Sequence, residues 1–213
     1  MEIHAHSLRP EGLPLNTVEG TVWRDNLVID TKKNYLLKGT SGRGKSTFLH
    51  ILCGIRKNYT GRFTVDGKDG RDFTPQDWAT LRGGPFGIVF QDLRLLPQLT
   101  ARQNLDLKSA LQDVPTDPVD MESKAQGLGV HPYLDNSCGK LSYGQQQRFA
   151  ILRALLQPFQ FLLLDEPFSH LDPENTKMAV GMVQNICKER GAGMLVSTLS
   201  EDYRLDWDEV LEV

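Results

Sequence analysis

One stretch decides how this chain folds: Gly39-Thr40-Ser41-Gly42-Arg43-Gly44-Lys45-Ser46-Thr47. The apolar residues just before it are typical of a buried strand, and residues 46–52 carry apolar side chains at helical spacing. Glycines at a strand-to-helix turn let successive backbone N–H groups face one anion, at the positive end of the helix dipole. The stretch therefore predicts a loop that grips the phosphates of a nucleoside triphosphate. The alternative is a glycine-rich turn with an exposed lysine.

Two side chains of this loop have expected roles. Lys45 should reach the β- and γ-phosphates, and the hydroxyl of Ser46 should ligate Mg²⁺. A nucleoside triphosphate with Mg²⁺ is thus the expected ligand.

A second informative stretch is Phe161-Leu162-Leu163-Leu164-Asp165-Glu166-Pro167. Its apolar part is too short to span a membrane and is typical of a buried parallel strand. At the carboxyl end of such a strand, Asp165 can hold Mg²⁺ through water and Glu166 can act as general base on the attacking water. The alternative is a strand followed by a solvated acidic turn.

A third stretch, residues 141–148, precedes a strongly helical segment, 149–156. Ser142 is a candidate N-cap, and together with Gly144 it offers a hydroxyl and a backbone donor to an anion. The chain therefore carries two helix starts suited to phosphate.

With these stretches in this order, the chain resembles the ATP-binding cassette family, the nucleotide-binding subunits of ABC transporters, over nearly its whole length. The phosphate loop matches the family's Walker A motif, and Asp165 and Glu166 match Walker B and the catalytic glutamate. Other matches are Gln91 to the Q-loop, Leu141–Gln145 to the signature and Ser169–Asp172 to the D-loop. Residues 95–100 and 104–105 resemble the subgroup that serves lipoprotein release, macrolide export and cell division; the other interpretation of Leu95-Leu96-Pro97 is a hydrophobic plug at a helix start.

The resemblance implies an α/β fold with a P-loop NTPase core around a mostly parallel sheet. A flanking antiparallel β subdomain and an inserted α-helical subdomain complete it. The whole chain, 1–213, is expected to be a single ATP-binding cassette. Within it, residues 1–91 and 158–213 form the nucleotide-binding core and residues 92–157 the helical signature subdomain.

The resemblance also implies a clamp that binds and hydrolyses ATP. Two cassettes, identical or different, meet head to tail, and the signature of one closes over the γ-phosphate held by the other. A transmembrane permease subunit is the second expected partner, and its short helix enters the groove beside the Q-loop. The expected catalytic residues are Glu166 and Gln91, and the expected Mg²⁺ ligands are Ser46, Gln91 and Asp165. The expected nucleotide contacts are Gly39, Thr40, Ser41, Gly42, Arg43, Gly44, Lys45, Ser46, Thr47, Ser142, Gly144, Gln145 and Asp172.

Three positions depart from the family pattern. Leu199 stands where the family places a switch histidine, after the expected strand 194–198, so the chemical step loses one electrostatic helper. We therefore expect ATP hydrolysis with slow turnover. The alternative is an ATP-gated regulatory cassette with little hydrolysis. The expected place of the adenine-stacking aromatic, residues 12–16, holds no ring; Trp23, the nearest, is expected to start a strand over 22–29 and to pack in the core. Tyr143 replaces a signature glycine.

Composition limits the other possibilities. A net charge of −3 gives no basic field for nucleic acid, and the absence of long insertions argues against a cassette that acts on DNA or ribosomes. No apolar stretch is long enough to insert in a membrane, and no signal pattern opens the chain. We therefore expect a cytoplasmic protein, peripheral on the membrane through its permease.

Three widely spaced cysteines, Cys53, Cys138 and Cys187, indicate a reduced compartment.

The remaining segments give coarser predictions. Residues 1–31 suggest antiparallel strands with a turn at Arg9–Gly12, and Gly61–Gly67 suggests a strand that ends in an Asp-Gly turn. His4 and His6 should share one strand face, as a partly exposed pair rather than a metal site. Residues 113–118 are expected to form a loop between helices. His170 is either a functional residue near the dimer seam or a polar residue at a helix start.

Overall fold

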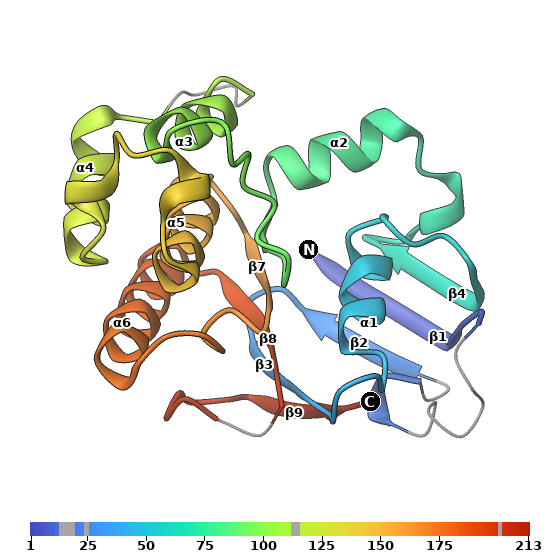
Figure 1. Cartoon of the computed structure of the whole chain (residues 1–213). Helices are drawn as coiled ribbons and strands as arrows, with labels where there is room; N and C mark the ends of the chain where they lie inside the picture. The colour runs from blue at the N-terminus through green and yellow to red at the C-terminus, as the bar shows by residue number, and fades with distance from the viewer. Residues whose placement is uncertain (13–19, 24–25, 112–115, 200–201) are drawn as a thin grey trace.

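The computed structural model describes residues 1–12, 20–23, 26–111, 116–199 and 202–213, and these contain two sheets (Figure 1). The five-stranded sheet has the order β6-β7-β8-β3-β9, and its strands all pair in parallel. Its strands are β6 (Phe86–Val89), β7 (Phe161–Asp165), β8 (Gly193–Thr198), β3 (Asn34–Lys38) and β9 (Glu209–Glu212). The predicted mostly parallel core is thereby confirmed.

The second sheet is antiparallel and has the order β2-β1-β4-β5. Its strands are β2 (Asn26–Asp30), β1 (Glu2–Pro10), β4 (Tyr59–Val65) and β5 (Lys68–Asp69). The predicted antiparallel flank is confirmed, and so is the turn after β4, where Asp66 and Gly67 both have positive φ. His4 and His6 lie on the exposed face of β1, as expected.

Strands of the parallel sheet are buried on both faces. Phe161 and Leu163 of β7 belong to one hydrophobic cluster, whereas the intervening Leu162 and Leu164 belong to a second. The first cluster lies between the two sheets and includes α1 (Lys45–Leu52); the second includes α5 (Tyr143–Leu156) and α6 (Pro173–Arg190). Figure 1 shows α1 and α5 on opposite sides of β7. Burial on both faces explains why these strands are continuous apolar runs.

The described residues between 92 and 157 form helices and turns and no strand beyond one isolated bridge, Thr100 to Ser137. They comprise α3 (Ala101–Ser109), α4 (Pro118–Gly127), α5 and the 3-10 turns η4 (His131–Tyr133) and η5 (Cys138–Lys140). α2 (Pro75–Gly83) follows the 3-10 turn η3 (Gly70–Asp72) and begins at a capping box between Thr74 and Asp77. Similar capping boxes at Thr100 and Ser142 start α3 and α5, because each threonine or serine is followed three residues later by a glutamine.

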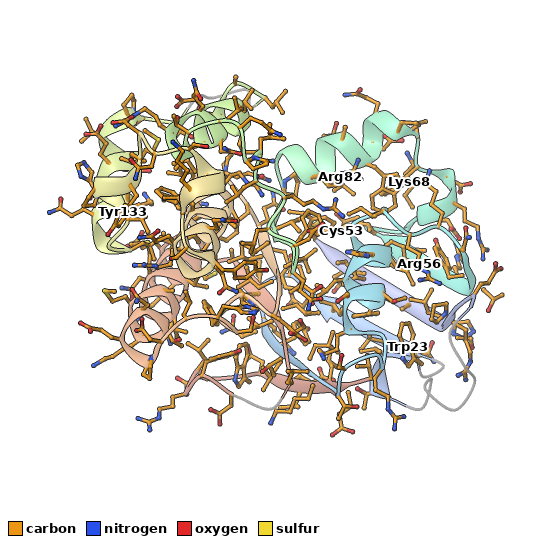
Figure 2. The ribbon with its side chains drawn as sticks, in the orientation of Figure 1. Trp23, Cys53, Arg56, Lys68, Arg82 and Tyr133 are labelled. Carbon is orange, nitrogen blue, oxygen red and sulfur yellow. The ribbon has the colours of Figure 1, made fainter. Side chains whose placement is uncertain are left out.

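Two sequence predictions need correction. Trp23 does not start a strand: it closes the 3-10 turn η2 (Thr21–Trp23), and β2 begins at Asn26. Its ring is buried, as expected, and packs edge-on against Phe48 with 5.7 Å between ring centres (Figure 2). Arg9 and Pro10 belong to β1 rather than to a turn, because Arg9 and Pro10 pair with Thr60 and Tyr59 of β4. Of the predicted 113–118 loop, residues 113–115 lie outside the described chain; α4 begins at Pro118, capped by Asp117.

The three cysteines are buried and form no disulfide. Burial raises the pKa of the Cys53 and Cys187 thiols to about 12, so neither is reactive near neutral pH. In the part of the chain that the structure describes, no helix has both the length and the apolar character needed to cross a bilayer. The same part holds no cluster of three or more His, Cys, Asp or Glu side chains suited to a metal.

Candidate nucleotide site

The predicted phosphate loop connects β3 to α1. Gly42 and Gly44 have φ angles of 80° and 108°, in the left-handed region that favours glycine. Gly44 caps α1, and its carbonyl accepts the N–H of Phe48 at 2.8 Å. The N–H groups of the first helical turn have no partner within the helix, so they are available to an anion.

Lys45 lies beneath the loop and is 5% exposed. Its ammonium group donates to the carbonyl of Gly39 at 2.7 Å and lies 3.4 Å from that of Thr40. It also lies 3.1 Å from Oε1 of Glu166. The loop's own backbone and one carboxylate thus hold the ammonium group at the bottom of the loop.

The two carboxylates at the end of β7 are oriented by the neighbouring strand. Asp165 pairs in register with Ser197 of β8. The Ser197 hydroxyl donates to Asp165 Oδ1 at 2.6 Å and accepts the N–H of Glu166 at 3.0 Å. Glu166 itself has a φ of 48°, an uncommon conformation for a residue other than glycine. Such backbone strain is concentrated at functional sites.

The residues here fit a divalent cation. Asp165 is buried, and its Oδ2 makes no hydrogen bond within the described chain, so one carboxylate oxygen is left for a further ligand. Ser46 and Gln91 add a hydroxyl and an amide from the neighbouring cavity wall. Such oxygen donors suit Mg²⁺, which usually also takes phosphate oxygens and water.

Residues from four segments of the chain line one cavity of about 600 Å³. They come from the phosphate loop, from the segment after β6, from the turn after β7 and from the end of β8. The lining residues are Ser41, Gly42, Gly44, Lys45, Ser46, Thr47, Gln91, Glu166, Ser169, His170 and Leu199. The structure therefore brings together the phosphate loop, Gln91 and Glu166, which the sequence places far apart.

Leu199 and His170 both line this cavity. Leu199 is half exposed and offers no hydrogen bond from its side chain. His170 comes from the turn after β7, where its Nδ1 is 2.9 Å from the hydroxyl of Ser169. Leu199, at the position where the family pattern has a histidine, and His170 therefore line the same cavity.

The signature residues lie elsewhere. Ser142, Gly144 and Gln145 do not line the cavity, and Ser142 and Gln145 cap each other at the start of α5. Asp172 caps α6 and is also outside the cavity. Hydrogen bonds from the backbone and side chain of Asn175 lower the pKa of Asp172. Within one chain, these four predicted contacts therefore lie outside the lining of the cavity at Lys45.

Three contacts at the site escaped the sequence analysis. Ser197 orients both carboxylates. Gln147 is buried in α5, and its side-chain amide donates to the carbonyl of Glu166 at 3.1 Å and accepts the N–H of His170 at 3.2 Å. The hydroxyl of Tyr143 donates to the carbonyl of Gln91 at 3.0 Å. For Ser197 the available signal was a polar residue at the end of the apolar strand β8, whereas Gln147 stands in the polar run 145–148 and gave no such signal. The expected adenine contact at residues 12–16 lies, apart from Gly12, outside the described residues.

Comparisons with known proteins agree with this arrangement. The sequence profile of the ABC transporter family matches residues 24–169. The chain is 33% identical over 168 residues to the ABC transporter ATP-binding protein YtrE of Bacillus subtilis, covering 77% of this chain and 72% of that protein. It is 33% identical over 181 residues to the lipoprotein-releasing system ATP-binding protein LolD 1 of Rhodopseudomonas palustris, covering 83% and 80%. It matches the macrolide export ATP-binding/permease protein MacB of Syntrophobacter fumaroxidans at 34% identity, over 76% of this chain but 23% of that protein.

The fold is similar to that of solved cassettes. The dimeric structure of the bacterial ABC transporter cassette MJ0796 superposes with a TM-score of 0.84 and covers 99% of this chain and 94% of that one, at 23% identity. The profile match over residues 24–169 and the relatives at 33% identity show that the chain belongs to the ABC transporter family. It is an ATP-binding cassette of the kind that forms the ATPase subunits of these transporters, and its relatives include the lipoprotein-release and macrolide-export proteins that residues 95–105 resemble.

Proposed function

We propose that this cassette binds ATP with Mg²⁺ in the cavity at Lys45 and hydrolyses it with Glu166 as the general base. The observation that carries the proposal is the meeting of Lys45, Gln91 and Glu166 on one cavity wall. The phosphate loop supplies N–H groups and an ammonium group for the phosphates, and the glutamate supplies a proton acceptor. A neighbouring cavity of about 870 Å³ shares Glu166, Ser169 and Leu199 with it but is not lined by Lys45 or Gln91.

The proposed reaction is an in-line displacement. Glu166 accepts a proton from a water molecule while the oxygen of that water bonds to the γ-phosphorus. The bond between the γ-phosphorus and the bridging oxygen breaks, and its electron pair stays with ADP. Lys45 and the loop N–H groups stabilise the charge on the transferring phosphoryl oxygens. Bound Mg²⁺, held by Ser46, Gln91 and Asp165, supplies further charge neutralisation. Leu199 contributes nothing polar, which favours slow turnover.

The proposal includes a head-to-tail dimer. Ser142, Gly144 and Gln145 lie at an exposed helix start and outside their own chain's cavity, which supports a role over the nucleotide of a second cassette. The same holds for Asp172 at the start of α6. ATP would then join two molecules, and hydrolysis would release them.

The partner of this dimer is proposed to be a transmembrane permease. The names of the relatives describe subunits of export, import and release systems, and MacB carries its permease in the same chain. We propose that this cassette attaches to the cytoplasmic face of a membrane through such a permease. Residues 1–91 and 158–213 would bind the nucleotide, and residues 92–157 would carry the signature.

The test is phosphate release from purified wild type and from Glu166→Gln, with Glu174→Gln as the matched control on the exposed start of α6. We expect Glu166→Gln to retain ATP binding, to lose at least a hundredfold in rate and to form an ATP-dependent dimer in size-exclusion chromatography. A Glu166→Gln protein that hydrolyses as fast as wild type would remove Glu166 from its role. ATP binding without turnover in the wild type, even with its permease, would favour the regulatory cassette.

A further inference from the structure

Helix α5 adds no residue to the lining of the candidate nucleotide cavity, yet its side chains hold the backbone of three residues that do line it. Tyr143 donates to the carbonyl of Gln91 at 3.0 Å. Gln147 donates to the carbonyl of Glu166 and accepts the N–H of His170. Figure 1 shows α5 beside β7, whose end carries the cavity's carboxylates. The helix therefore helps to place these residues without lining the cavity.

The segment that follows β6 is bound by α5 at two points. Leu93 and Arg94 have φ angles of 57° and 48°, a conformation that is uncommon and strained for residues other than glycine. Arg153, near the end of α5, donates to the carbonyls of both residues at 2.6 Å. Tyr143, at the start of α5, donates to the carbonyl of Gln91. The Tyr143 bond thus fixes the end of the segment whose side chain lines the cavity.

The ring of Tyr143 makes a second contact with a residue of the cavity lining. Its centre lies 4.4 Å from the centre of the His170 ring, and the two ring planes make an angle of 60°. Inclined aromatic pairs of this kind are favourable. The ring is therefore anchored while the hydroxyl bonds to Gln91. Because Tyr143 is 43% exposed, its side chain can be changed without opening the core.

This position holds a glycine in the family pattern. A glycine has no side chain, so it would supply neither the hydroxyl for the Gln91 carbonyl nor the ring against His170. A tyrosine that only covered surface would need no directed partner, whereas Tyr143 has one for its hydroxyl and one for its ring. Both partners line the same cavity. These contacts are a feature that this chain adds to the pattern.

We propose that Tyr143 is a positioning residue for ATP hydrolysis, whose hydroxyl holds the backbone of Gln91 so that the Gln91 amide stays at the cavity. The role of Gln91 as a ligand for Mg²⁺ rests on the proposed function, whereas the role of Tyr143 rests on its contacts with Gln91 and His170. Tyr143 binds the main-chain carbonyl and not the side-chain amide. Changing the Gln91 side chain therefore leaves the Tyr143 bond in place.

The test compares wild type with Tyr143→Phe, which removes the hydroxyl and keeps the ring against His170. Phosphate release at saturating ATP should fall about tenfold, and the half-saturating Mg²⁺ concentration should rise about tenfold. The half-saturating ATP concentration should change by less than about twofold, because the phosphate loop is untouched. Tyr133→Phe makes the same chemical change in η4, outside the cavity, and should alter none of these values; Figure 2 shows Tyr133 beside α4. Equal Mg²⁺ dependence in Tyr143→Phe and wild type would overturn the proposal.

A double-variant comparison tests the route through Gln91. If Tyr143 acts by placing the Gln91 amide, Tyr143→Phe should have little effect in a chain that already carries Gln91→Ala. The same loss in both backgrounds would overturn the proposal, because Tyr143 would then act through another residue.

Hydrogen exchange measures the position of the segment without any reaction. Peptides that span residues 90–95 should exchange faster in Tyr143→Phe than in wild type, in the absence of nucleotide, and Tyr133→Phe should match wild type. Identical exchange in Tyr143→Phe and wild type would show that the hydroxyl does not hold the segment, and would overturn the proposal.

Further measurements separate positioning from other effects. Thermal unfolding of Tyr143→Phe should match that of wild type; a lower rate seen only together with a lower unfolding midpoint would overturn the positioning role. Tyr143→Phe added to Glu166→Gln should still form the ATP-dependent dimer, and loss of that dimer would place the hydroxyl at the contact between cassettes instead. If wild type released no phosphate, the proposed hydrolysis would fail, and Mg²⁺-dependent binding of a fluorescent ATP analogue to the same variants would still decide the role of Tyr143.

Discussion

The ammonium group of Lys45 lies 3.1 Å from the carboxylate of Glu166, so the proposed phosphate ligand and the proposed general base neutralise each other. Their side chains are 4% and 13% exposed, which gives the pair little screening by water. A triphosphate entering the loop would compete with Glu166 for Lys45. Binding of the substrate would thereby release the base that accepts a proton from the attacking water.

Glu166→Gln should destabilise the protein without nucleotide, because it leaves the buried ammonium group of Lys45 without a countercharge. We expect a loss of about 2 kcal/mol in the free energy of unfolding, measured in urea. Saturating ATP should reduce the difference between variant and wild type, since phosphates replace the lost carboxylate. Glu174→Gln serves as control, and an equal effect of both variants would show that the Lys45–Glu166 pair contributes nothing.

Ser197→Ala should impair activity from a position behind the cavity. The variant removes the donor to Asp165 Oδ1 and the acceptor of the Glu166 N–H. We expect a loss of about tenfold or more in turnover and a weaker apparent affinity for Mg²⁺, measured by titrating Mg²⁺ into the ATPase assay.

Ser137→Ala is the matched control for this experiment, because its hydroxyl also donates a short bond, 2.7 Å to the carbonyl of Pro97, outside the site. Both variants should lose about 1 kcal/mol of stability. An unchanged Mg²⁺ dependence in Ser197→Ala would mean that Asp165 needs no orientation by Ser197.

Leu199→His should accelerate hydrolysis. The side chain lines the cavity and is 52% exposed, so an imidazole has room there. One added hydrogen-bond donor at the reacting phosphoryl group could raise turnover by about tenfold to a hundredfold. Phosphate release at pH 6 to 8 checks this, with Leu199→Ala as control; equal rates in all three proteins would mean that His170 or another group already supplies this function.

Lys108 should make stability depend on pH in the alkaline range. Its pKa is about 8 in the folded chain, against the ordinary 10.5, so the unfolded chain binds the proton more tightly. Stability contributed by this group therefore rises as pH increases from about 8 toward 10.5, and the cost of burying the charged ammonium group beside Arg153 and Arg82 is fully present below pH 8. Lys108→Met should flatten the pH dependence of the unfolding midpoint relative to wild type; identical pH profiles would contradict the shift.

The sequence predicted the local elements of the site well because each is encoded over a few neighbouring residues. Gly42 and Gly44 mark the turn into α1, Ser142 with Gln145 marks the start of α5, and an apolar run marks β7. The prediction for Trp23 was half right. Its burial follows from its size and apolarity, but a 3-10 turn in place of a strand depends on the contacts of that segment with its surroundings.

Contacts between distant segments could not be predicted in this way. The hydroxyl of Ser197 reaches Asp165 only because β7 and β8 are adjacent and in that register, and Tyr143 reaches Gln91 from a helix 52 residues further along the chain. Arg82, Lys108 and Arg153, which line one cavity, come from α2, α3 and α5. In the sequence they are ordinary surface charges.

The sequence by itself determined the family, the parallel core and the groups that a triphosphate requires, because these depend on motifs and on hydrophobic periodicity along a continuous chain. The tertiary structure alone decided that Lys45 pairs with Glu166, that Leu199 lines their cavity, and that Arg82, Lys108 and Arg153 line one cavity. The physical reason is that charge pairing and burial depend on distances in space, which strand order, register and helix packing set.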